Sequence, residues 1–339
     1  MILTSRNTQR NSALDFTKGA LVLIMVLYHW LNYFWGPHDN RYLRFLTPSF
    51  IFISGFIISN VYFSKYGVSD PQLPKRLIQR GLKILGVFAL LNVTRNFLMR
   101  GGAQDQVAPA ESLGKRFIDI YLIGNGVGGG QAKAVAFFIL VPISYLLILS
   151  ALLLLLARVY RYTFHIACLL FLLCAVVSNI VGVEVPSLEL LAIGLLGVIA
   201  GYAPIEKVNA AVRHPVLLAA AYITYLGAIS IWNVSYPLQV LGVYLSLMII
   251  YLLGQHDGEP NNFRGTVVLL GKYSLLGYIS QIAILQILRV IFNHVESENT
   301  VLGLSFVSAF VLTILSIELV DRARSQSKTV DRLYRAVFA

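Results

Sequence analysis

Three polar side chains gather near the end of a mostly apolar stretch close to the start of the chain, "LDFTKGALVLIMVLYHWLNYF", residues 14–34. His29, Asn32 and Tyr33 are three and four residues apart, so on a helix an imidazole, a carboxamide and a phenol share one face. Histidine exchanges a proton near neutral pH, and the other two can hydrogen-bond to it or to a substrate. The spacing predicts a candidate acid–base site. A neutral histidine bonded to a neighbouring helix is the alternative.

A second group of chemically capable residues is basic and lies in "LPKRLIQRGLKILGVF", residues 73–88. Arg76, Arg80 and Lys83 recur at intervals of four and three, which places them on one stripe of a helix. Fixed cations on such a stripe suit an anionic ligand, such as the phosphates of a nucleotide-bearing cofactor. The alternative is anchoring at the membrane surface by long basic side chains, which is our expectation for Lys75 and Arg76 in particular.

The composition shows what must position these groups. Of 339 residues, 57% are hydrophobic and only 13% are charged, against about 45–50% and about 25% in ordinary globular domains. The chain is therefore predicted to be an integral membrane protein. Its first apolar run is not followed by a small-residue cleavage site, so we expect this helix to be retained.

Apolar runs of about twenty residues, the length that crosses a bilayer, recur along the whole chain. They predict an all-α, polytopic membrane protein of about ten transmembrane helices in a single domain, residues 1–339. A short extra apolar piece is expected near residues 265–270. The predicted spans are residues 17–34, 45–63, 77–95, 134–157, 163–182, 187–204, 215–232, 236–254, 273–293 and 300–320.

Lys and Arg gather in alternate connections, which predicts that both termini face the cytoplasm. The net charge of +11 is explained mostly by this topology, so no nucleic-acid partner is expected. Counting about 1.5 Å per residue from residue 17 places His29 about 18 Å into the membrane, just past its midplane. Ionisable groups at such depth usually mark pathways or sites.

Other motifs carry less chemistry. The glycine-rich stretch "GNGVGGG", residues 124–130, lies in a long outer connection and is interpreted as a hinge or lid, because a phosphate loop would need a preceding strand and a following helix. Cys168 and Cys174 are six residues apart in one apolar run, on different faces of a helix. No disulfide or metal framework is expected.

Four blocks in order resemble the transmembrane acyltransferase superfamily, which includes the acyltransferase-three proteins, the glucan succinyltransferases and the lysosomal heparan glucosaminide N-acetyltransferases. The blocks are "LDFTKGALVLIMVLYHW", "RFLTPSFIFISGFIIS", "KRLIQRGLKI" and "LGKYSLLGYISQ". The resemblance implies transfer of an acyl group, usually acetyl from acetyl-CoA, to a sugar on the extracytoplasmic side of the membrane.

The resemblance also assigns residues. His29 matches the first-helix histidine, and Arg80 and Lys83 match a pair of basic residues. Asp15 is retained, while Lys18-Gly19 replaces an Arg-Gly pair. Where many members have a histidine, this chain has Gln281, which cannot carry a proton.

The heparan-type branch implies a competing base. His38 precedes the block "PSFIFISG", and its place in an outer loop matches the essential histidine of that branch. We favour His29, because its depth is harder to explain by packing alone.

The predicted mechanism combines these groups. Arg80, Lys83 and Arg76 hold the phosphates of acyl-CoA, expected to be acetyl-CoA, with no metal. His29, or His38, takes the proton from the acceptor hydroxyl or amine, and Asn32 and Tyr33 orient the imidazole or stabilise the oxyanion. Direct attack and a covalent acyl-histidine both fit the sequence.

Two other classes of function are compatible with this sequence. A transporter of a small polar or anionic solute would also need about ten helices with buried polar groups, and a non-catalytic assembly protein would need neither histidine. The expected location is the inner cell membrane, with membrane lipid and an extracytoplasmic glycan as partners. The oligomeric state is open between monomer and homo-oligomer.

The charge pattern gives a first prediction, on topology. Single cysteines placed in residues 102–112 should react with an impermeant thiol reagent from outside intact cells, whereas a cysteine at residue 327 should react only after permeabilisation. Outside reactivity at residue 327 would contradict the even number of spans and the placement of both substrates.

Overall fold

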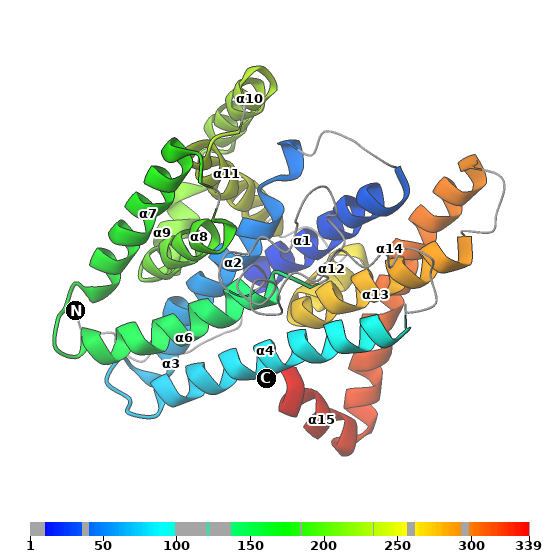
Figure 1. The fold of residues 1–339 in the computed structure, drawn as a ribbon, viewed down its shortest axis with the longest axis horizontal. Coiled ribbons are helices and arrows are strands. Elements are labelled where there is room, and N and C mark those ends of the chain that lie inside the picture. The colour runs from blue at the N-terminus through cyan, green and yellow to red at the C-terminus, as the bar shows by residue number, and fades with distance from the viewer. Residues whose placement is uncertain are drawn as a thin grey trace, which may run out of the picture. The chain divides into compact units, whose positions relative to one another are not determined.

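The computed structural model describes residues 11–35, 41–98, 121, 137–183, 185–232, 234–255, 262–292 and 298–338. Within these residues all regular structure is helical (Figure 1). This confirms the predicted all-α class. His38 and the glycine-rich stretch at residues 124–130 lie outside the described residues.

The chain divides into two compact units. Unit 1 is Ile51–Pro204, and unit 2 combines Gln9–Phe50 with Ile205–Ala339. Helix α2 (Leu46–Ile57) carries the chain from unit 2 into unit 1.

In unit 1, α4 packs along α6 and α7 packs along α8, and the α4–α6 pair is visible side by side in Figure 1. Gly182 ends α7 with φ of +78°, a left-handed conformation that glycine adopts without strain. The elements of this unit after α2 are the π-helix η3 (Ile58–Phe63), α3 (Ser64–Tyr66), α4 (Leu73–Leu98), α6 (Leu140–Ala157), α7 (Thr163–Val181) and α8 (Pro186–Gly201).

In unit 2, α1 is the central element and packs against α11, α12, α13 and α14. Its first turn is capped by Asn11, whose side chain accepts a hydrogen bond from the Leu14 backbone N–H at 3.1 Å. The helices of this unit besides α2 are α1 (Ser12–Trp30), the π-helix η1 (Leu31–Trp35), the 3-10 turn η2 (Arg41–Leu43), α9 (Ile205–Ala211), α10 (Pro215–Ile231), α11 (Tyr236–Gln255), α12 (Asn262–Lys272), α13 (Ser274–Phe292), α14 (Glu298–Gln326) and α15 (Lys328–Phe338).

Each of the ten predicted spans overlaps a helix, but the number of full-length spans is lower among the described residues. Eight helices are long and apolar enough to cross a membrane, or nine if the bent pair α8 and α9 forms one span. The remaining predicted span, residues 215–232, is α10, an apolar helix of 17 residues. At about 1.5 Å per residue it reaches about 25 Å, near the lower limit for a bilayer. The extra apolar piece near residues 265–270 is confirmed as α12.

Helices α1 and α12 approach each other closely enough for their backbones to touch. A Cβ atom on Gly19 would overlap the Val267 carbonyl, and one on Gly271 would overlap the Asp15 carbonyl. Small residues allow such approaches inside membranes, where lipid tails are as apolar as the helices and burial alone drives little association. Two glycines, one from each helix, thus fix how α1 sits in unit 2.

Unit 1 uses the same device between α2 and α8. A Cβ on Gly55 would overlap the Gly194 carbonyl, and one on Gly197 would overlap the backbone of Phe52. One turn further, Ser59 donates a hydrogen bond to the Val198 carbonyl at 2.6 Å, and the side chain is buried. Close backbone contact and a buried polar bond therefore hold the same pair of segments.

The α1–α12 contact gives a second prediction. Gly271→Ala should lower the stability of the detergent-purified protein by about 1–3 kcal/mol, because the new methyl group must push α12 away from the Asp15 backbone. Gly265→Ala, in the same helix with nothing within 4 Å of its Cβ position, should be neutral or stabilising, because alanine favours helix. Thermal unfolding measures both, and equal effects would contradict the packing.

Candidate functional site

His29 lies in the last turn of α1, directly before the chain passes into the π-helix η1. The residue is half-buried, but its Nε2 atom is fully enclosed and has no hydrogen-bond partner among the described residues. Its ring contacts Tyr28 of the same helix, with centroids 5.2 Å apart, and Tyr278 of α13, at 6.4 Å. The imidazole therefore presents an unsatisfied nitrogen at the contact between α1 and α13.

Gln281 lies one turn after Tyr278 on α13, so both side chains leave the same face of that helix. It has no exposed surface, and neither its amide nitrogen nor its amide oxygen has a partner among the described residues. A buried polar atom without a partner costs about 1–3 kcal/mol. Most such atoms in folded proteins are paired with protein or ordered water. Together with Nε2 of His29, the packed helices α1 and α13 enclose three polar atoms with unmet hydrogen-bonding capacity.

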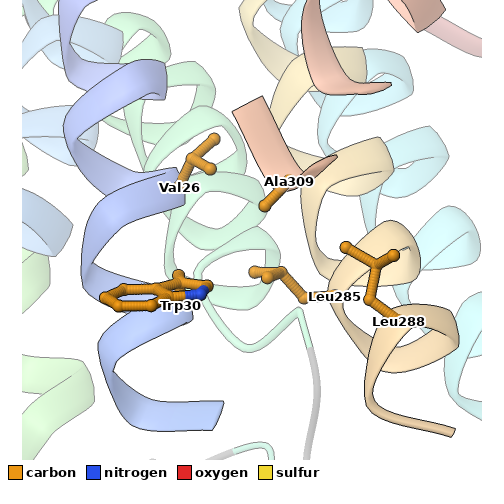
Figure 2. Packing of buried hydrophobic residues seen from close by; sticks show 5 residues of the cluster. All are labelled: Val26, Trp30, Leu285, Leu288 and Ala309. Atoms are coloured by element: carbon orange, nitrogen blue, oxygen red, sulfur yellow. The ribbon is translucent and has the colours of Figure 1, made fainter. Parts of the chain in front are cut away.

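Apolar packing around the next residue, Trp30, restricts the position of His29. Trp30 packs with Val26 of α1, Leu285 and Leu288 of α13 and Ala309 of α14 (Figure 2). Its indole N–H donates a buried hydrogen bond of 2.9 Å to the Ser305 hydroxyl. Because this side chain is fixed by both packing and a directional bond, the preceding residue has little freedom to move.

Asn32 and Tyr33 do not follow the α-helical geometry expected from their spacing. The chain is a π-helix from Leu31, which takes more residues per turn than an α-helix and so rotates both side chains relative to His29. Asn32 donates to the Tyr28 carbonyl at 2.8 Å, and the Tyr33 hydroxyl accepts a bond of 3.3 Å from Gln286. The Asn32 bond is local, whereas the Tyr33 bond joins η1 to α13. Their roles in catalysis stay predictions.

The basic stripe lies in unit 1, on the first half of α4. Arg80 is half-buried, donates to the Tyr62 hydroxyl and lies over that ring, 5.5 Å from its centroid. Arg76 is exposed and lies 4.4 Å from the Tyr66 centroid. Lys83 is exposed on the same helix. Aromatic rings therefore support two of the three predicted cations. The sequence analysis did not predict these contacts.

Tyr62 lies in the π-helix η3 and Tyr66 in α3, four residues later. Their spacing of four, opposite Arg76 and Arg80 at the same spacing, is the sequence signal that could have predicted the pairing. A guanidinium stacked on a ring is held in one orientation, and its planar fork of donors matches the geometry of a phosphate. The arrangement fits an anionic ligand. His29 belongs to unit 2, and the basic stripe belongs to unit 1.

Asp15 and Lys18 form a tight ion pair of 2.6 Å at the start of α1, and Asp15 is only 4% exposed. The pair stands beside the contact of Asp15 with Gly271. This geometry assigns the "DFTKG" block to the packing of α1 on α12. Among the described residues, no group of three or more His, Cys, Asp and Glu side chains could hold a metal ion.

Comparison with known proteins adds one finding. A family model described as an acyltransferase domain matches residues 11–318. Neither the curated proteins nor the solved structures give a match.

The unpaired amide of Gln281 gives a third prediction. Gln281→Met should keep or raise the melting temperature of the purified protein, because an apolar side chain of similar shape replaces a group with unmet bonds. Gln286→Met, one and a half turns further along α13, should lower it, because the bond to Tyr33 is lost. A clear loss of stability at residue 281 would indicate that its amide has a structural partner.

Proposed function

Because this chain belongs to the acyltransferase-three family, whose model matches residues 11–318, we propose that it transfers an acyl group from acyl-CoA to an extracytoplasmic acceptor. The chain is a multi-pass membrane protein with an acyltransferase domain. In more detail, we propose that the acyl group is acetyl and that the acceptor is a hydroxyl or amine of a glycan or similar molecule. The proposed location is the inner cell membrane.

The observation that carries this proposal is the enclosed Nε2 of His29, which has no hydrogen-bond partner among the described residues. The Gln281 amide, on the facing helix α13, has no partner among them either. A general base must be free to accept a proton, and a base already bonded to protein would have to give up that bond first. The only other polar group with comparable unmet capacity on the facing helix is an amide, which can donate to a carbonyl oxygen. This pair suits acyl transfer better than an isolated packing histidine.

The proposed chemistry is as follows. His29 removes the proton of the acceptor hydroxyl as its oxygen forms a bond to the thioester carbonyl carbon. The carbonyl oxygen gains negative charge, and in this proposal the Gln281 amide N–H donates to it. The C–S bond then breaks, and the proton on His29 passes to the departing sulfur, so that an ester and free CoA thiol are formed. An amine acceptor gives an amide by the same steps.

The basic stripe supplies donor binding in this proposal. Arg80 and Lys83, with Arg76, would hold the phosphates of acyl-CoA by charge-assisted hydrogen bonds. Arg80 suits this role best, because its contact with the Tyr62 ring and hydroxyl pre-organises the guanidinium. The binding residues and the base are tested separately, since they belong to different units.

The activity itself is tested with purified protein and radiolabelled acetyl-CoA. The proposal expects CoA release and label on an extractable glycan, with label on the protein only if an acyl-histidine forms. Uptake of a labelled polar solute into vesicles without CoA release would instead establish a transporter.

A fourth prediction concerns the base. His29→Gln should reduce turnover by about 10²–10⁴-fold while leaving the protein folded, because glutamine can bond but cannot take the proton. His38→Gln tests the competing base, and His214→Gln, an exposed histidine at the start of α10, is the control that should not change turnover. Full activity of His29→Gln with loss in His38→Gln would transfer the role to His38.

A fifth prediction concerns donor binding. Changing Arg80 and Lys83 together to Gln should raise the apparent KM for acyl-CoA far more than that for the acceptor, because charge-assisted bonds to phosphate are lost. Lys75→Gln on the same helix is the control. Equal effects on both substrates, or failure of the variant to insert, would assign the stripe to membrane anchoring.

A further inference from the structure

The last helix of the chain, α15, lies beyond the final apolar span. Only Ser327 separates it from α14, and the chain changes direction sharply there (Figure 1). Because α14 already supplies the spanning segment up to Gln326, burial in the hydrocarbon core does not account for apolar side chains on α15.

One face of α15 is clamped to the rest of unit 2. Asp331 accepts two hydrogen bonds from Arg324 of α14, at 2.6 and 3.0 Å. The Arg324 guanidinium also lies 4.0 Å from the ring centroid of Tyr334, which in turn contacts Tyr273 and Phe338. Asp331, Tyr334 and Phe338 are three, four and seven residues apart and thus share this face.

The clamp is an ionised network. Tyr273 donates to Asp321 at 2.6 Å and accepts from Arg324 at 3.0 Å. Burial, followed by the bond to Asp321, raises the pKa of Tyr273 to about 12, so the phenol stays neutral. The hydrogen bond from Arg324 lowers the pKa of Asp331 below its ordinary value. The ion pair between Arg324 and Asp331 is therefore maintained across the neutral pH range.

A second face of α15 is apolar and is not used by the clamp. At 100° per residue, Val330, Leu333 and Val337 form one strip. Leu333 is 66% exposed, and Val330 and Val337 on either side of it are half-buried. A third face is basic: Lys328, Arg332 and Arg335 lie on the opposite side of the helix and all are exposed. Arg335 also pairs with Asp331 at 2.7 Å.

We propose that α15 lies along the membrane surface at which α14 ends and binds anionic lipid headgroups there. The strip of Val330, Leu333 and Val337 enters the boundary between headgroups and acyl chains, while Lys328 and Arg332 attract the negative surface. A short helix with an apolar face and a cationic polar face is the pattern of helices that lie in this plane. Three cations against one carboxylate match an anionic surface.

Two features indicate that the partner of α15 is an anionic lipid surface: the charge of the helix and its closeness to the end of the last span. The helix begins two residues after the last residue of α14, so its clamp holds it close to the level where that span ends. The charge pattern predicts that the C-terminus faces the cytoplasm, and the cytoplasmic leaflet carries anionic lipids. An apolar protein partner would not need the cations. A protein partner is the competing outcome of the test.

The experiment uses full-length protein with Cys168 and Cys174 replaced by alanine and a single cysteine at residue 333, carrying an environment-sensitive fluorophore. A matched protein carries the label at residue 332, on the basic face. Both are reconstituted into vesicles of phosphatidylcholine with phosphatidylglycerol. The label at residue 333 should emit at shorter wavelength and be quenched by nitroxide lipids, and the label at residue 332 should be quenched by aqueous iodide.

Two results would overturn the proposal. Quenching of both labels by iodide to the same extent would place α15 in solution, and shielding of residue 333 from both quenchers would indicate a protein partner. The accessibility readout does not depend on acyl transfer, so it stands whether or not the proposed activity is found.

The role of charge is tested by Lys328→Gln with Arg332→Gln, in the chain labelled at residue 333. Each cation near an anionic surface is worth about 1 kcal/mol, so the docking equilibrium should shift about thirtyfold toward the iodide-accessible state. The shift should be absent in vesicles of phosphatidylcholine alone. An equal shift in both kinds of vesicle, with an unchanged melting temperature, would show that the two cations do not interact with anionic lipid headgroups.

Discussion

Backbone contact between helices is the constraint on which both units of this protein depend. Lipid tails compete with apolar side chains on equal terms, so helices in a membrane gain little by hiding leucine and must instead approach closely. Gly19 and Gly271 permit this between α1 and α12, and Gly197 permits it between α8 and the Phe52 backbone. Any side chain at these positions would separate the pair. The placement of α1, and hence of His29 at its far end, follows from a contact four turns away.

This constraint changes how the charged residues of "DFTKG", residues 15–19, are understood. Its carboxylate and ammonium groups neutralise each other at 2.6 Å, and Asp15 is nearly inaccessible. A buried ion pair adds little net stability, but breaking it leaves an uncompensated charge. Both partners lie on α1, so the pair leaves Asp15 compensated at the turn next to the contact of Gly19 with Val267. This part of the first of the four blocks that carry the resemblance takes part in packing in this structure.

The sequence predicted the helices well because their signal is local. Ten apolar runs fell on helices, and the break at Gly271 and Lys272 correctly indicated the short helix α12. The π-helices η1 and η3 were not predicted, since a change from i→i+4 to i→i+5 bonding has no compositional signal. Neither was the burial of Gln281: a polar residue in an apolar run can face protein, water or lipid, and only the packing of α13 on α1 decides. The roles of Asn32, Tyr33 and the basic stripe stay predictions, because each depends on a bound substrate.

The fold tolerates the unpaired atoms of His29 and Gln281 because the helices that carry them cannot rotate to pair them. In a low-dielectric interior an unmet hydrogen bond is costly, and a loosely held helix would rotate to satisfy it. Here rotation is opposed on α1 by the glycine contact at one end and by the Trp30–Ser305 bond near the other. α13 is held by the packing of Leu285 and Leu288 against the same tryptophan (Figure 2). Rigid neighbours thus keep a proton acceptor and an amide poised and unsatisfied, and a substrate that supplies their missing bonds gains the free energy that the fold gives up.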